Sequence, residues 1–165
     1  AAMRVNEGEA DALVTGYSRS YPSVAKPMIE LIGKAPGIKR IAATNILMTE
    51  GGPMFFSDTA FNISPSEEEL VQIAVETSRV MKIFGIEPVL AMLSYSNFGS
   101  AKSKSASKVS GAVAYIHEHY PDIIIDGEIQ ADFALNPEML KAKFPFSKLA
   151  GKKVKQELHV FFLFF

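Results

Sequence analysis

A polar loop follows a short apolar run at Pro88–Ser107, and its residue types are those that bind anions. Residues 94–107 are rich in Ser, Gly and Lys. The run Val89–Leu93 is typical of a buried strand, and Lys108–His119 of a helix with one apolar face. The loop therefore joins the C-terminal end of a strand to the N-terminus of a helix, where open α/β sheets bind ligands and where unpaired N–H groups attract anions.

Three lysines, Lys102, Lys104 and Lys108, add positive charge to this loop. We therefore expect it to bind a phosphate or carboxylate group. A mobile, solvated Ser/Lys linker is the alternative, because such compositions are common in loops that bind nothing. The candidate binding residues in the loop are Ser94, Ser96, Asn97, Gly99 and Ser100.

A second polar cluster follows the apolar run at 123–125. Asp126 and Gly127 end that run, and Gln130 and Asp132 come shortly after. The three side chains of Asp126, Gln130 and Asp132 are candidates for ordering a phosphate-binding loop. In the alternative interpretation, Asp126-Gly127 is only a turn and Asp132 only a helix cap. The spacing alone does not bring the two carboxylates within reach of each other for acid–base catalysis.

Taken together, the segments SYSNFGS and IDGEIQADFAL resemble the phosphotransacetylase family. ADALVTG at Ala10–Gly16 is similar to a third motif of that family. FGIEP at Phe84–Pro88 and the stretch that begins at Leu149 follow in matching order, so the resemblance extends to about Val154. The segment GYSRSYPSVAKP is most similar to the phosphotransacetylase-like C-terminal domain of NADP-dependent malic enzymes.

The resemblance implies a reaction and a set of ligands. The family converts acetyl-CoA and phosphate to acetyl phosphate and CoA, so acetyl-CoA, CoA, acetyl phosphate and phosphate are the expected partners, in a homo-oligomer without a covalently bound cofactor. The polar cluster at 126–132 would then order the phosphopantetheine arm.

The resemblance also adds Arg19, Ser20 and Lys26 to the candidate acyl-phosphate and CoA-binding residues. Lys26 aligns with an arginine of the family, and lysine keeps the charge but lacks the planar fork that grips phosphate. Arg19 is placed to restore a guanidinium. In the alternative interpretation, both are solvated cations near a helix end.

The resemblance ends near Val154, where the chain continues as KQELHVFFLFF. We expect a partial phosphotransacetylase-like domain over residues 1–154 and a divergent apolar tail over 155–165, produced by truncation or a shifted reading frame. A genuine divergent terminus is the alternative. Phe161–Phe165 would either complete a buried strand or form an aggregation-prone edge. The family's Ser-Arg pair and the Asp that orient CoA and activate its thiol have no counterpart here, so no catalytic residue is assigned.

Three functions are compatible with these observations. One is acyl transfer between CoA and phosphate. The second is a domain that senses acetyl-CoA and is inactive by itself. We favour this second function because Lys26 stands where the family has an arginine and because the sequence is most similar to the malic-enzyme domain. The third is an oligomerisation domain that retains only the fold.

Composition excludes several other classes. The chain has 165 residues, 48% of them hydrophobic, a formal net charge of −1 and no cysteine. These values favour one soluble cytoplasmic domain and argue against a nucleic-acid-binding or membrane-surface protein. No run approaches the roughly 20 apolar residues of a membrane span. Neither a metal pair at His117 and His119, nor a phosphate-binding GxxxxGK[ST] loop, nor a GxSxG elbow is present.

Alternating strand and helix signals predict the elements that must position these residues. Strands are expected at 12–15, 41–48, 54–56, 89–93 and from 123, and helices at 21–32, 64–84, 108–119 and from 136. Gly51-Gly52 predicts a hairpin, and Pro27 a kink in the first helix. The alternation predicts a three-layer α/β/α sandwich on a mixed, mostly parallel sheet, the fold that the resemblance also implies (phosphotransacetylase, isocitrate-dehydrogenase-like).

Overall fold

The computed structural model describes residues 1–58, 61–152 and 160–162. The chain forms two compact units, Ala1–Ile41 and Ala42–Phe165. The first unit contains two helices in contact with each other, α1 (Ala2–Asn6) and α2 (Tyr21–Leu31).

The first unit confirms the predicted helix but not its surroundings. α2 starts after Ser20, with Pro22 in its first turn and Pro27 inside it. The expected apolar stripe is not buried, because no residue of α2 is buried and two short helices offer too little apolar surface for a core. The strand predicted at 12–15 is also wrong: the segment is irregular and Val14 is 97% exposed. A strand needs a neighbour to pair its N–H and C=O groups, and no strand is described in this unit.

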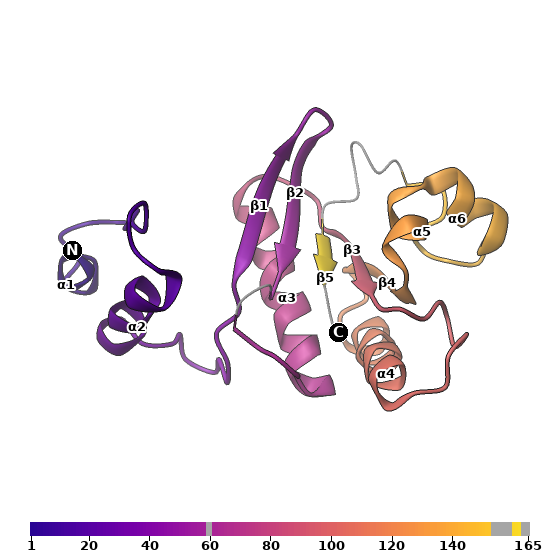
Figure 1. Ribbon diagram of the computed structural model, residues 1–165, viewed down its shortest axis with the longest axis horizontal. Helices are drawn as coiled ribbons and strands as arrows, with labels where there is room; N and C mark the ends of the chain where they lie inside the picture. The colour runs from indigo at the N-terminus through magenta and orange to yellow at the C-terminus, as the bar shows by residue number, and fades with distance from the viewer. Residues whose placement is uncertain (59–60, 153–159, 163–165) are drawn as a thin grey trace. The chain divides into compact units, whose positions relative to one another are not determined.

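The second unit is built on a five-stranded sheet (Figure 1). The strand order is β1-β2-β5-β3-β4. The hairpin predicted at Gly51-Gly52 is confirmed, since β1 and β2 pair antiparallel with Thr49 opposite Gly52, while every other neighbouring pair is parallel. The sheet is therefore mixed and mostly parallel, as predicted. The strands are β1 (Thr44–Thr49), β2 (Gly52–Ser57), β3 (Val89–Leu93), β4 (Ile124–Ile129) and β5 (Val160–Phe162).

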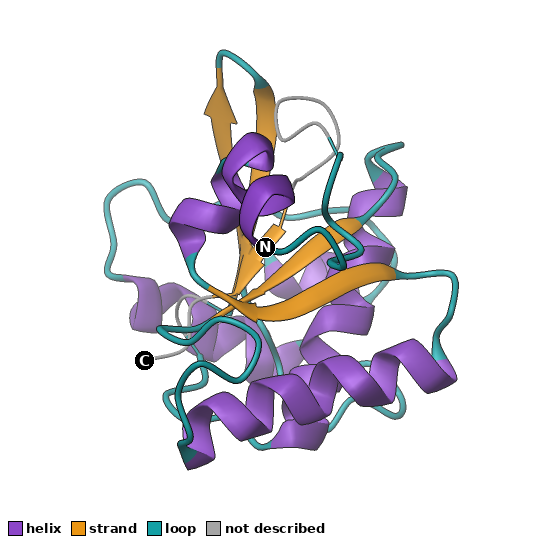
Figure 2. Ribbon diagram, turned by 90° about the vertical axis from the view of Figure 1, so that its right-hand side faces the viewer, coloured by secondary structure: helices purple, strands orange, loops and turns teal. Residues whose placement is uncertain are grey.

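Residues of β3 contribute alternately to two separate cores, which makes the fold a three-layer sandwich. Leu90 and Met92 pack in one core with residues of α3 (Glu67–Ile83) and α4 (Lys104–His119). The intervening residues Val89, Ala91 and Leu93 pack in the other core with Ala134 of α5 (Ala131–Leu135) and Leu140 of α6 (Pro137–Lys143). A strand buried on both faces reads as a continuous apolar run, and helices cover both sides of the sheet (Figure 2).

Serine caps fix where the two long helices begin. Ser66 Oγ accepts a hydrogen bond from Glu69 N at 3.2 Å, and Glu69 Oε2 accepts one from Ser66 N at 2.8 Å, which completes a capping box at the start of α3. α4 begins at Lys104, four residues earlier than predicted, because Ser103 Oγ accepts from Ala106 N at 3.1 Å. Lys104 therefore belongs to the first turn of α4 rather than to the loop.

The end of the chain contributes to the sheet through β5. In the parallel ladders, Phe161 pairs with Phe56 of β2 and with Ala91 of β3. Of the two alternatives for the apolar run at 161–165, the described part thus completes a strand inside the sheet. Residues 153–159 and 163–165, which make up most of the predicted tail, lie outside the described residues.

Candidate anion-binding site

The C-terminal ends of β3 and β4 lie side by side, and the loop at residues 94–103, which follows β3, is hydrogen-bonded to the end of β4. Ser94 N donates to Ile129 O at 2.9 Å, and Phe98 N donates to Glu128 O at 2.8 Å. The loop therefore sits at the C-terminal edge of the parallel strands, where sequence reasoning placed it, and it leads directly into α4.

Glu128 is the centre of the loop's hydrogen bonding. Its side chain is 1% exposed, and Oε1 accepts from Ser96 Oγ at 2.9 Å and from Gly99 N at 2.6 Å. Ser96 is itself fully buried, and its Oγ also accepts from Ala101 N at 3.0 Å. The Glu128 carboxylate thus ties β4 to the loop at two positions, Ser96 and Gly99.

An irregularity in β4 points Glu128 toward the loop. Met92 of β3 pairs with Gly127, but the next residue, Leu93, pairs with Ile129, so Glu128 is an extra residue in the ladder. Such a bulge redirects a side chain. Gly127 has a φ of +147°, and a Cβ there would lie 2.5 Å from Met92 O, so only glycine fits at this close approach.

A second set of hydrogen bonds comes from side-chain amides. Asn97 Nδ2 donates to Gln130 Oε1 at 2.8 Å, while Gln130 N donates to Asn97 Oδ1 at 2.7 Å. Gln130 Nε2 donates to Tyr95 O at 2.7 Å, and Ser100 Oγ accepts from Asn97 N at 2.8 Å. Ser94 Oγ accepts from Ser96 N at 3.3 Å. The structure therefore brings the predicted residues of the loop together with Gln130, and their hydrogen bonds shape the loop.

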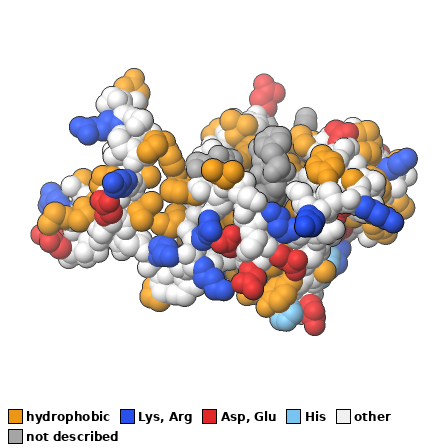
Figure 3. All heavy atoms as spheres, turned by 60° about the horizontal axis from the view of Figure 1, so that its bottom comes forward, with side chains coloured by type: hydrophobic (Ala, Val, Ile, Leu, Met, Phe, Trp, Pro, Cys, Tyr) orange, Lys and Arg blue, Asp and Glu red, His pale blue; other side chains and the backbone are white. Residues whose placement is uncertain are grey.

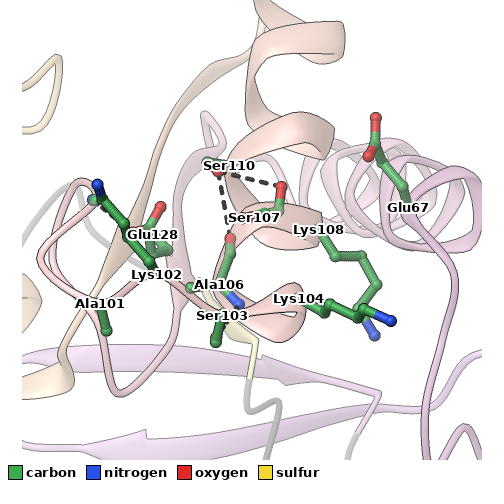
Figure 4. Close-up of a pocket in the computed structure, with 11 residues that line it drawn as sticks. Glu67, Ala101, Lys102, Ser103, Lys104, Ala106, Ser107, Lys108, Ser110 and Glu128 are labelled. Atoms are coloured by element: carbon green, nitrogen blue, oxygen red, sulfur yellow. Dashed lines mark hydrogen bonds between the residues drawn. The ribbon is translucent and has the colours of Figure 1, made fainter.

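A cavity of about 780 Å³ lies between this loop and the first turns of α4 (Figure 4). Lys104 and Lys108 extend from α4, and Glu67 extends from α3. Lys102 and Glu128 lie on the opposite side of Ser103 from these two helix lysines. Within the described part of the chain, none of the three lysine ammonium groups forms an ion pair or a hydrogen bond. The lining residues are Glu67, Gly99, Ala101, Lys102, Ser103, Lys104, Ala106, Ser107, Lys108, Ser110 and Glu128.

Three lysines and two carboxylates give this cavity an excess of positive charge. The N-terminus of α4 adds its partial positive charge and the N–H groups of its first turn. Unpaired ammonium groups at a helix N-terminus favour a phosphate or carboxylate ligand. The positive charge predicted for this loop is thus gathered at one cavity.

The two aspartates predicted beside Gln130 do not line the cavity. Asp126 Oδ2 accepts from Ser147 Oγ and from Lys148 N, both at 2.8 Å, and so anchors the loop that follows α6. Asp132 is exposed in the first turn of α5. A ligand role for either residue stays a prediction.

The remaining candidates, Arg19, Ser20 and Lys26, belong to the first unit. Ser20 is the N-cap residue of α2 without a side-chain hydrogen bond to the helix. Lys26 Nζ lies 3.8 Å from Glu30 Oε1, one turn further along, and both side chains are exposed. Their role in binding also stays a prediction.

Sequence reasoning missed the two carboxylates that line the cavity, Glu67 and Glu128. Glu67 lies in the acidic first turn of α3, where a carboxylate is favourable beside the positive end of the helix dipole. For Glu128 a signal existed, since it lies in the segment IIDGEI between the apolar run at 123–125 and Ile129, and an acidic residue is almost never buried without a partner or a function.

The two histidines of α4 form hydrogen bonds to backbone carbonyl groups outside the cavity. His119 Nδ1 hydrogen-bonds to Tyr115 O of the same helix at 3.0 Å, and His117 Nε2 to Ile125 O of β4 at 2.8 Å. Among the described residues, no three His, Cys, Asp or Glu side chains gather as metal ligands, and no helix is both long and apolar enough to span a membrane. Basic and acidic side chains are interspersed on the face shown in Figure 3.

Comparisons with known proteins identify relatives that match most of this chain. The sequence pattern of the phosphate acetyl/butaryl transferase family matches residues 1–154. A phosphate acetyltransferase of Bacillus subtilis is 38% identical over 149 residues, which cover 90% of this chain and 46% of that protein. An NADP-dependent malic enzyme of Salmonella typhimurium is 38% identical over 150 residues, covering 91% of this chain and 20% of the enzyme.

Solved structures agree with these relatives. A phosphotransacetylase from Streptococcus pyogenes superposes with a TM-score of 0.82 at 38% identity, covering 98% of this chain and 48% of that one. The chain thus spans less than half the length of the acetyltransferases and a fifth of the malic enzyme.

Proposed function

The chain belongs to the phosphate acetyl/butaryl transferase family, and on that premise we propose that its cavity binds acetyl-CoA, CoA and phosphate. We propose further that the parent protein is an NADP-dependent malic enzyme in which this phosphotransacetylase-like domain senses acetyl-CoA. In this proposal the domain is a cytoplasmic homo-oligomer, accepts acetyl phosphate as well, and does not catalyse acyl transfer by itself.

The observation that supports binding is the cluster of three unpaired lysines around the N-terminus of α4. Phosphate, acetyl phosphate and CoA share one recognisable feature, a negatively charged phosphoryl group. The cavity offers ammonium groups, serine hydroxyls and helix N–H groups to such a ligand.

The proposed inactivity rests on what acyl transfer requires. Attack of the CoA thiolate on an acyl phosphate needs a base near the sulfur and a preorganised positive clamp on the phosphoryl group. No arginine is among the described residues that line the cavity, and lysine lacks the bidentate fork.

Calorimetric titration tests the binding proposal. The chain should bind phosphate and CoA at millimolar concentrations or below, with an affinity that falls as salt is added, because exposed charges are screened. The double substitution Lys102→Ala and Lys104→Ala should weaken binding about tenfold and reduce the salt dependence. Lys148→Ala is the matched control, since Lys148 is exposed but lies outside the cavity. Absence of binding by the unsubstituted chain would contradict the proposal.

A coupled assay separates the sensing domain from an enzyme. Formation of acetyl-CoA from acetyl phosphate and CoA should remain at background with this chain. Turnover of about one per second would instead indicate part of a genuine phosphate acetyl/butyryltransferase. The similarity to the Bacillus subtilis phosphate acetyltransferase favours that second candidate.

A further inference from the structure

We propose that Gly111 keeps the lysines of the cavity free for a ligand, because the absence of a side chain there makes room for the Glu67 carboxylate away from them. The inference rests on the proposed anion site and adds a positioning residue to it. Its basis is a close contact between α3 and α4, on the face of α4 that carries Lys104 and Lys108.

Gly111 is not required by the conformation of the backbone. It lies in the middle of α4 and does not have a positive φ. Glycine inside a helix lowers stability relative to alanine, because it loses more backbone freedom on folding. The reason for a glycine at this position therefore lies in its neighbours.

The neighbour of Gly111 is the Glu67 carboxylate. A Cβ at position 111 would meet Glu67 Oε2, and would lie 2.6 Å from Glu67 Cδ and 2.8 Å from Oε1. The carboxylate thus occupies the space that any side chain at position 111 would need. Since Glu67 is the first residue of α3, this contact joins the start of one long helix to the middle of the other.

Gly111 shares one face of α4 with two of the lysines. Positions 104, 108 and 111 are spaced by four and three residues, which places them along one face of a helix. Because Glu67 contacts Gly111, its carboxylate lies about one helical turn from Lys108. It points away from the ends of the Lys104 and Lys108 side chains (Figure 4), and among the described residues no ion pair joins it to either lysine.

Of the two carboxylates that line the cavity, only Glu67 is free to move. Glu128 is 1% exposed and accepts hydrogen bonds from Ser96 Oγ and Gly99 N. Glu67 is exposed, and its carboxylate has no hydrogen bond or ion pair within the described part of the chain. A methyl group at position 111 would displace this carboxylate, and the ammonium groups one turn away would attract it. Glu67 would then compete with an anionic ligand for the lysines.

The substitution Gly111→Ala tests this role. It adds one methyl group and favours the helix, so the variant should be at least as stable as the unsubstituted chain in urea unfolding. Its affinity for phosphate and for CoA should nevertheless fall about threefold to fivefold, which is the effect of one exposed ion pair. Calorimetric titration of the full chain measures both affinities.

A second substitution, Glu67→Gln, separates charge from shape. Glutamine is of similar size but has no charge to pair with a lysine. Added to Gly111→Ala, it should restore the affinity at least to that of the unsubstituted chain, whereas alone it should raise the affinity by about twofold, because only a longer-range repulsion is removed. Glu118→Gln, at an exposed acid near the far end of α4, is the matched control and should restore nothing in Gly111→Ala.

The outcomes separate the two proposals. Absence of phosphate and CoA binding by the unsubstituted chain would overturn the proposed anion site itself. Equal affinities of the unsubstituted chain and Gly111→Ala would overturn the role of Gly111 and leave the anion site standing. A loss of affinity that Glu67→Gln does not restore would overturn that role as well. A Gly111→Ala chain that does not fold would do the same, because it would show that the Glu67 carboxylate cannot move aside.

Discussion

Asp58 lies at the C-terminal end of β2 in an unusual environment. Its φ is +58° and it is 5% exposed. Oδ1 accepts from Asn62 Nδ2 at 2.8 Å, but Oδ2 has no hydrogen-bond partner in the part of the chain that the structure describes. Burial raises the pKa of the Asp58 carboxyl above its usual value of 3.8, and the nearby Glu69 carboxylate raises it further, whereas hydrogen bonds from Asn62 and Phe61 act in the opposite direction.

This shift predicts how Asp58→Asn changes stability with pH. A carboxyl whose pKa is higher in the folded chain binds its proton more tightly there than in the unfolded chain. The contribution of this carboxyl to folding stability is therefore largest when the pH is below its usual pKa, and it is lost as the pH rises through the raised pKa. Asparagine removes the titration and tolerates a positive φ. The variant should therefore gain stability relative to the unsubstituted chain as pH increases from about 4 to 8. Urea unfolding at several pH values measures this gain, and parallel curves for the two proteins would contradict it.

At the scale of single residues, sequence reasoning located the loop better than it located the carboxylates that line the cavity. Ser94, Ser96, Asn97, Ser100 and Gln130 were found because polar residues follow buried strands. Their hydrogen bonds shape the loop. The position of Glu128 depends on a bulge in the β3–β4 ladder, and the spacing of residues along one strand does not show how it pairs with another.

At the scale of elements, the start of α3 depends on one serine. Both hydrogen bonds of the capping box run between Ser66 and Glu69, while Ser64 is exposed. Ser66→Ala should therefore lower the free energy of unfolding by about 1 kcal/mol, because an N–H group at the helix start loses its acceptor. Ser64→Ala is the matched control and should change stability by less than about 0.5 kcal/mol. Equal effects of the two substitutions in urea unfolding would show that the box does not stabilise the helix.

Elements with a strong local signal were predictable. α3, β3 and the β1–β2 hairpin each carry a cap, a fully apolar run or a glycine turn within a few residues. The strand predicted at 12–15 and the buried stripe of α2 failed for a different reason. Burial needs a partner surface, and an apolar pattern does not specify whether one is supplied.

At the scale of the whole molecule, the layers were predictable but the strand order was not. Alternation of strands and helices requires apolar faces on both sides of the sheet, and the two cores confirm this. β5, however, enters between β2 and β3 although it is the last strand in the chain. The order of strands depends on contacts between residues far apart in the sequence, and the pattern of apolar and polar residues within one segment does not predict such contacts.

The same sheet carries an edge that predicts self-association. β1 is an outer strand, and Ile46, Leu47 and Met48 on it are 41%, 53% and 74% exposed. An exposed apolar edge strand offers unpaired N–H and C=O groups and apolar surface to a second copy of the chain. The chain should therefore form dimers or larger species whose proportion rises with concentration, which light scattering after size-exclusion chromatography measures. Leu47→Lys with Met48→Lys should shift the mass toward the monomer. The control Ile83→Lys should not, because Ile83 is an apolar residue at the end of α3, away from the edge strand, although it is 82% exposed. A monomer mass that stays constant at all concentrations would exclude the edge as an interface.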